Sequence, residues 1–190
     1  MSKGRLEAFS DGVLAIVITI MVLELKIPHQ DDLSALKPLL PVILSYILSF
    51  VYVGIYWNNH HHMLQKAHKI NGTTLWANLH LLFWLSLLPF VTGWMGENNF
   101  TLWPVVCYGF VLIMAAIAYY ILAHGLTSLH GKESDFTKAL GRDWKGIGSI
   151  AIYAVGIALS FIHPLLAIGC YTFVSLMWII PDKRFEFENK

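Results

Sequence analysis

Long runs without a charged side chain alternate with short charged segments along this chain. No Asp, Glu, Lys or Arg occurs in residues 38–65, 70–96, 98–131 or 146–181. A helix needs about 20 mostly apolar residues to cross a bilayer core of about 30 Å, so each run is long enough for a transmembrane helix. An apolar segment at residues 6–27 adds a first helix, although acidic residues flank its uncharged part, residues 12–23.

The last uncharged run is too long for one crossing. As a single helix its 36 residues would extend about 54 Å at 1.5 Å per residue. It contains the pair His163-Pro164, and proline cannot continue a helix and restrains the residue before it. We therefore predict two short helices joined by a tight turn, and an all-α integral membrane bundle of six transmembrane helices.

Basic residues set the orientation of this bundle. Cytoplasmic segments of membrane proteins carry an excess of Lys and Arg. With the N-terminus in the cytoplasm, only Lys26 and Lys37 fall outside. The inner side then holds eleven basic residues: Lys3, Arg5, Lys66, Lys69, Lys132, Lys138, Arg142, Lys145, Lys183, Arg184 and Lys190. We expect both termini to be cytoplasmic, with residues 126–145 as a short basic linker.

Composition supports a membrane protein and excludes several other classes. Hydrophobic residues make up 56% and charged residues 13% of the 190 positions, against about 25% charged in soluble domains. The net charge of +1 argues against nucleic-acid binding, which needs a basic excess. We expect one transmembrane domain, residues 1–190, in the cell inner membrane or plasma membrane, in contact with the lipid bilayer.

The first helix carries two features with more than one interpretation. Asp11 is either a helix-end carboxylate satisfied by water near Arg5, or a buried carboxylate paired with a group from another helix, such as the His60–His62 run, His80 or Asn78. Ile16, Ile20 and Leu23 form one stripe with Thr19 at its edge. By its pattern, such a stripe is typical of ordinary helix packing, and its spacing alone does not say what the stripe faces.

Metal-dependent and catalytic functions find little support. Successive residues on a helix point about 100° apart, so the three adjacent histidines cannot close on one ion. We therefore expect no metal site and no cofactor, with His60 in a polar network. The sequence contains no HExxH, GxSxG or GxxxxGK[ST] motif, so we do not expect an enzyme.

Several motifs resemble one family of channels. Arg5, Phe9, Ser10 and Asp11 spell RxxxFSD at the head of the first helix. A WxxH motif, residues 57–60, then LWANL at residues 75–79 and SLLPF at residues 86–90 follow in order. This combination is similar to the transmembrane protein 175 family of potassium channels, and it covers the first half of the chain.

The resemblance implies a function and a set of functional residues. Bacterial members with one six-helix unit assemble as homotetramers that pass potassium ions, and their first helices line the pore without a carbonyl filter. No segment here resembles the TVGYG loop of such a filter. The family's apolar constriction maps to Ile16, Ile20 and Leu23, and its selectivity threonine to Thr19. A structural polar network is implied for Arg5, Phe9, Ser10, Asp11, Trp57, His60 and Asn78.

One alternative function remains at this stage. A proton-coupled carrier of small molecules would use Asp11 and His60 as a proton relay. Carriers often have internal repeats and broken helices in the middle of the membrane, and neither is evident in the sequence.

Overall fold

The computed structural model describes residues 2–29, 31–131, 133–140 and 143–179, and these residues form helices joined by short connections. In chain order the elements are α1 (Lys3–Leu23), the 3₁₀ helix η1 (Leu33–Leu39), α2 (Leu40–Lys66), α3 (Gly72–Ser86), α4 (Leu88–Glu97), α5 (Leu102–His130), α6 (Asp135–Leu140), α7 (Trp144–Ser160) and α8 (Pro164–Ile179). The all-helical class predicted from the sequence is confirmed.

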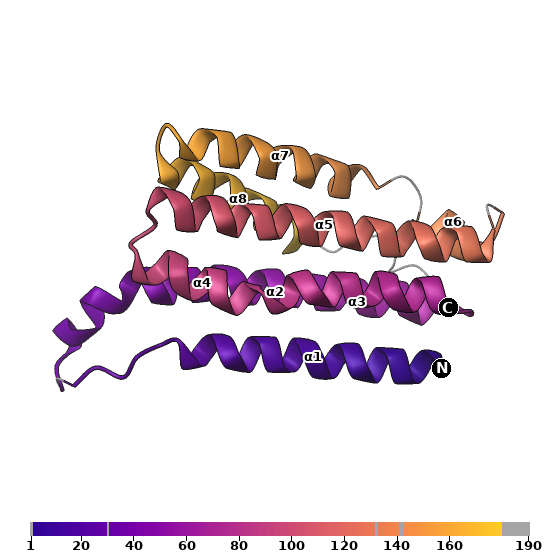
Figure 1. Ribbon diagram of the computed structural model, residues 1–190, viewed down its shortest axis with the longest axis horizontal. Helices are drawn as coiled ribbons and strands as arrows, with labels where there is room; N and C mark the ends of the chain where they lie inside the picture. Colours follow the sequence, from indigo (N-terminus) through magenta and orange to yellow (C-terminus); the bar gives the residue numbers. More distant parts are fainter. Residues whose placement is uncertain (1, 30, 132, 141–142, 180–190) are drawn as a thin grey trace.

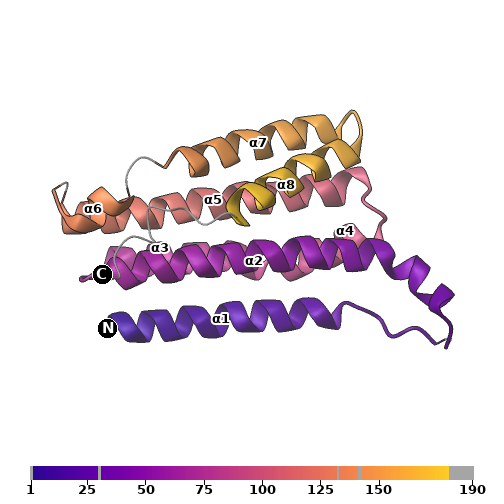
Figure 2. The same cartoon turned by 180° about the vertical axis from the view of Figure 1, so that it is seen from behind.

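The long helices run side by side in layers. In Figure 1, α1 lies along one edge, α2, α3 and α4 form the next layer, and α5 separates this layer from the hairpin of α7 and α8. Figure 2 shows the same order from behind. Within the described residues α1 packs mainly on α2, α3 and α4, so its outer side faces away from the rest of the bundle.

Length and hydropathy suit these helices for a membrane. Residues 3–23, 33–66, 72–97 and 102–130 each form a helical segment long and apolar enough to cross a bilayer. Helices α7 and α8 are apolar but shorter, with 17 and 16 residues. All six belong to the bundle drawn in Figure 1.

Proline residues define two of the helix boundaries. Helix α7 ends at Ser160 and α8 begins at Pro164, which confirms the predicted break at His163-Pro164. The uncharged run at residues 70–96 is also divided, because Pro89 lies in the first turn of α4 and α3 ends at Ser86. Proline at a first turn has no N–H to leave unpaired, so it begins a helix without cost.

Two predicted boundaries differ from the structure. Helix α1 ends at Leu23 and not at residue 27, because charged residues and Pro28 follow at once. The linker expected at residues 126–145 is partly helical, since α5 continues to His130 and α6 lies within the linker. Of the basic residues used for orientation, Lys132, Arg142, Lys183, Arg184 and Lys190 lie outside the described residues.

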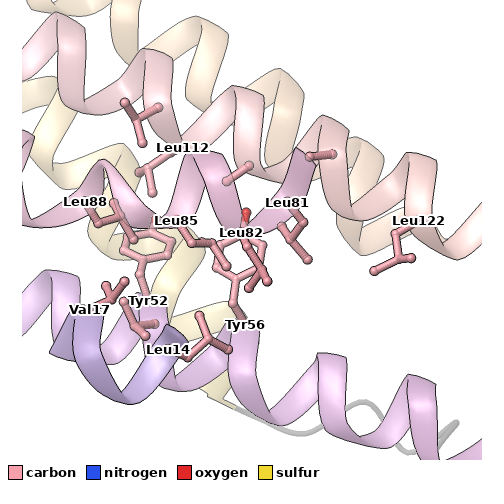
Figure 3. Packing of buried hydrophobic residues seen from close by; sticks show 14 of the residues in the cluster. Leu14, Val17, Tyr52, Tyr56, Leu81, Leu82, Leu85, Leu88, Leu112 and Leu122 are labelled. Carbon is pink, nitrogen blue, oxygen red and sulfur yellow. The ribbon is translucent and has the colours of Figure 1, made fainter. Parts of the chain in front are cut away.

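One continuous apolar core joins the helices. Leu14 and Val17 of α1 face Tyr52 of α2 and Leu85 of α3 in the cluster drawn in Figure 3. Close approach of α2 and α4 depends on Gly96, where an added Cβ would lie 2.6 Å from the Cα of Val42. The core thus holds one face of α1 against α2 and α3.

Candidate pore helix and its polar anchor

A buried hydrogen-bonded chain ties α1 to α2 and α3. Ser10 donates to the carbonyl oxygen of Leu6 at 2.8 Å, and its Oγ accepts from Nδ2 of Asn78 at 2.9 Å. Oδ1 of Asn78 lies 2.7 Å from Nε2 of His60, and because this oxygen can only accept, the ring nitrogen donates. Ser10 and Asn78 are fully buried and His60 is 2% exposed. The structure therefore brings together three of the residues expected in the polar network.

Asp11 is hydrogen-bonded to a residue that was not among its expected partners. Its Oδ1 accepts a hydrogen bond from Nε1 of Trp57 on α2 at 2.9 Å, and both side chains are exposed. The Trp57 ring stacks on His61 with centroids 5.9 Å apart. Asp11 is thus not a buried carboxylate paired with a base; it is exposed, and an indole N–H donates to it. Among the described residues, no hydrogen bond joins Asp11 to His60.

Arg5 and Phe9 stand apart from this network. Both are exposed on α1, and the side chain of Arg5 makes no hydrogen bond or ion pair with another described residue. The start of α1 is held instead by Lys3, whose Nζ donates to the carbonyl oxygen of Gln65 at 2.9 Å and lies 3.7 Å from Oε1 of Glu7. Sequence reasoning missed both contacts of Lys3, although its i, i+4 spacing from Glu7 was a signal for the ion pair.

The apolar stripe of α1 points away from the subunit core. The side chains of Ile16, Ile20 and Leu23 are 57%, 43% and 78% exposed. Thr19 is also exposed, and its hydroxyl donates to the carbonyl oxygen of Ile16 at 2.9 Å, which leaves the lone pairs of Oγ1 available. The opposite face is buried at Leu6, Ser10, Leu14, Val17 and Met21. The centres of the two faces are about 130° apart at 100° per residue.

A groove runs along the outer half of α1. Ile16, Ile20 and Glu24 form one wall, and Pro89 and Phe90 of α4 form the other; Val13, Val17 and Ser86 complete the lining. The break between α3 and α4 therefore lies beside the stripe.

An ion pair joins the segment after α1 to the end of α4. Nζ of Lys26 contacts Oε1 of Glu97 at 2.5 Å. This hydrogen bond, together with the negative charges of Glu97 and Glu24, raises the pKa of Lys26 above its usual value. The carboxylate of Glu24 lies against the backbone of Gly93 on α4. The segment after α1 is thus fastened to α4 at the end opposite the Ser10 network.

Comparisons with known proteins place the chain in one family. Residues 5–89 match the model of the endosomal/lysosomal potassium channel TMEM175. A potassium channel of Chryseobacterium sp. (strain P1-3) is 57% identical over 186 residues, which is 98% of this chain and 97% of the relative. The mouse endosomal/lysosomal proton channel TMEM175 is 35% identical over 101 residues, 47% of this chain and 20% of that protein.

A solved structure supports the same assignment. The crystal structure of a lysosomal potassium-selective channel TMEM175 homologue from Chamaesiphon minutus matches with a TM-score of 0.79 and 29% identity, covering 94% of this chain and 96% of that chain. All these relatives are named channels, which confirms the prediction that the chain is not an enzyme. The chain is a multi-pass membrane protein and belongs to the TMEM175 potassium channel family.

Proposed function

We propose that this chain is one subunit of a homotetrameric, potassium-permeable cation channel whose pore is lined by α1. In this proposal Ile16, Ile20 and Leu23 form the apolar constriction, and Thr19 offers hydroxyl oxygens to a passing ion. The potassium-channel names of the relatives from Chryseobacterium and Chamaesiphon minutus support the choice of ion.

One observation carries the proposal: α1 is buried on one face and apolar on its free face. Hydrogen bonds from Asn78 to Ser10 and from Trp57 to Asp11 hold the helix in a defined rotation. That rotation directs Ile16 and Ile20 outward. In a ring of subunits, four such faces meet at the axis and form a narrow apolar passage.

We also propose six crossings with both ends of the chain in the cytoplasm. Figure 1 shows the beginning of α1, the α2–α3 connection, the end of α5 and the beginning of α7 at the same end of the bundle. The basic residues there, among those described, are Lys3, Arg5, Lys66, Lys69, Lys138 and Lys145. Lys26 and Lys37 lie at the other end. By the excess of Lys and Arg, we assign the first end to the cytoplasm.

Physical chemistry predicts a modest preference for potassium in such a pore. Apolar side chains offer no ligand to a cation, so a ring of Ile16 gates by excluding water. An ion that crosses loses part of its hydration shell without full compensation. Potassium holds its water less tightly than sodium, so it passes more easily, and Thr19 returns part of the lost coordination. We therefore expect weaker discrimination than a filter of backbone carbonyls gives.

The first experiment measures the reversal potential of the purified protein in planar bilayers, with potassium on one side and sodium on the other. Discrete currents that reverse toward the potassium equilibrium potential support the channel. Absence of current, together with pH-driven uptake of a substrate into liposomes, would instead support the proton-coupled carrier.

A matched pair of variants tests the pore lining. Ile16→Asn places an amide in the constriction, and we expect a larger leak current and a lower potassium-to-sodium permeability ratio. Ile147→Asn is the control, because Ile147 is 47% exposed on α7, which packs on α5 and α8 and away from α1. Equal effects of the two substitutions would remove Ile16 from the pore.

Proton flux is a second readout of the same preparation. The mouse relative is named a proton channel, and a transient chain of water through a narrow apolar constriction conducts protons. A pH-sensitive dye inside the liposomes measures this flux, and Ile16→Asn should increase it if protons and potassium share the α1 pathway.

A further inference from the structure

His130, the last residue of α5, is used as a hydrogen-bond acceptor by a distant part of the chain. Its Nε2 accepts from the backbone N–H of His68 at 2.9 Å and from that of Lys69 at 3.2 Å. Its Nδ1 lies 2.8 Å from the carbonyl oxygen of Leu126. The imidazole thus fastens the connection between α2 and α3 to the end of α5.

These three contacts define the protonation state of the ring. A nitrogen that accepts from N–H groups carries no proton, so the single proton of the neutral ring is on Nδ1 and is donated to Leu126. An imidazolium has a proton on both nitrogens. Protonation of His130 would therefore abolish both contacts with the connection and place a new N–H against two backbone N–H groups.

Aromatic, titratable and charged groups from three elements surround His130. The α2–α3 connection contributes His68, whose ring centroid is 6.4 Å from that of His130, and Lys69. Phe136 of α6 stacks on the imidazole at 4.8 Å. Other charged side chains of the packed elements are Lys66 at the end of α2, and Glu133 and Lys138, whose Oε2 and Nζ lie 4.0 Å apart.

The fastened connection leads directly to the anchor of α1. Helix α3 begins at Gly72, where Asn71 accepts hydrogen bonds from the N–H and the hydroxyl of Thr74. Within the same helix, Asn78 donates to Ser10 of α1. A displacement of the α2–α3 connection therefore acts on the helix that holds α1 in its rotation.

We infer that His130 is a positioning residue that holds the α2–α3 connection only when its imidazole is neutral. Acid on the side of the membrane where α5 ends therefore releases the connection and lowers the channel current. The contact needs a free lone pair on Nε2, so the neutral ring makes it and the imidazolium, which acid forms, cannot. The link to current rests on the proposed channel function, whereas the release of the connection does not.

Hydrogen exchange tests the release directly. Amide exchange in residues 66–71 is measured by mass spectrometry on the purified protein at about pH 7.5 and about pH 5.5, on either side of the usual range of histidine. Rates are divided by those of an unstructured peptide at the same pH. We expect the amides of this connection to be less protected at the acidic pH, because the imidazolium cannot accept their hydrogen bonds. Unchanged protection would overturn the inference.

Two substitutions distinguish the effect of His130 on amide protection from that of another histidine on the same helix. In His130→Gln the side-chain oxygen reaches the position of Nε2 and accepts without titrating, so the protection should no longer depend on pH. His124→Gln is the control, because His124 makes the same contact with the carbonyl oxygen four residues earlier, Tyr120, and is exposed. Loss of pH dependence in His124→Gln, or its persistence in His130→Gln, would contradict the role of His130.

The test is completed by measuring currents at different pH values on the side of the membrane where α5 ends, which is the side rich in Lys and Arg. We expect acid to reduce the wild-type current and to leave that of His130→Gln unchanged. If hydrogen exchange changes with pH as expected but the current does not, then release of the α2–α3 connection does not affect the pore helix, and that part of the inference is refuted. If no current flows at any pH, the proposed function fails, and hydrogen exchange still decides whether His130 holds the connection.

Discussion

Substitution of Asn78 gives a quantitative test of how α1 is anchored. Asn78→Ala removes two buried hydrogen bonds, one with Ser10 at 2.9 Å and one with His60 at 2.7 Å. Each such bond contributes about 1 kcal/mol net, and the donor left without a partner on His60 costs about 1–3 kcal/mol. Polar contacts inside membrane proteins average about 0.6 kcal/mol. With about 0.6 kcal/mol for each of the two bonds and about 1–3 kcal/mol for the unpaired donor, we expect the free energy of unfolding to fall by about 2–4 kcal/mol. The fall is nearer the lower value if lipid or detergent supplies partners.

The assay is reversible unfolding in detergent micelles, followed by circular dichroism at a fixed protein concentration because oligomers gain stability with concentration. Asn59→Ala is the matched control. Asn59 is half-buried on α2, and its Nδ2 donates to the carbonyl oxygen of Ile55 in its own helix at 2.8 Å. Its loss should cost less than about 1 kcal/mol.

A double-mutant cycle separates the hydrogen bond from other effects of truncation. Ser10→Ala, Asn78→Ala and the double variant should show a coupling of about 0.5–1.5 kcal/mol, because the two side chains are in direct contact. Additive effects, or equal destabilisation by Asn78→Ala and Asn59→Ala, would refute the view that this chain of polar groups anchors α1.

Three further predictions concern other contacts. Asp11→Ala removes the acceptor of Trp57 and should lower the fraction of assembled oligomer in light scattering more than it changes the permeability ratio; altered selectivity in a fully assembled variant would contradict this. Gly96→Ala should destabilise the fold by about 1–3 kcal/mol through overpacking, whereas Gly125→Ala, with open space around its Cα, should not. The pKa of Lys26 is raised from 10.5 chiefly by its hydrogen bond with Glu97, so on the alkaline side the pair is lost as the pH rises through that raised value. Glu97→Gln should return the NMR titration of Lys26 toward 10.5, and an unchanged titration would exclude the pair.

Much of the fold follows from local properties of the sequence. Apolar runs of sufficient length specify helices in a membrane protein, since a helix satisfies its own backbone hydrogen bonds in hydrocarbon. The break before Pro164 follows from the missing N–H and fixed backbone angle of proline. The break between α3 and α4 was not predicted, because its proline lies inside an uninterrupted apolar run and the tolerance of a helix for proline depends on its neighbours.

The polar network shows where prediction from the sequence ends. The motifs singled out Ser10, Trp57, His60 and Asn78, but spacing along the chain did not predict which of them are bonded to each other. Asp11 illustrates this, since an indole N–H and not a basic group is its partner. Such a choice depends on the rotation and relative height of two packed helices, which no single helix specifies.

By itself, the sequence determined the class of this protein: a helical membrane protein with a polar signature at the head of its first helix and an apolar stripe behind it. It did not decide whether the stripe packs inside the subunit or faces outward, since both arrangements have the same periodicity. The tertiary structure decided this by burying Leu14, Val17 and Met21 and leaving Ile16 and Ile20 exposed. It also brought the end of α5 to the α2–α3 connection, where His130 meets backbone groups about 60 residues earlier in the chain. Contacts between such distant residues arise from the packing of whole helices, and a local pattern carries no information about them.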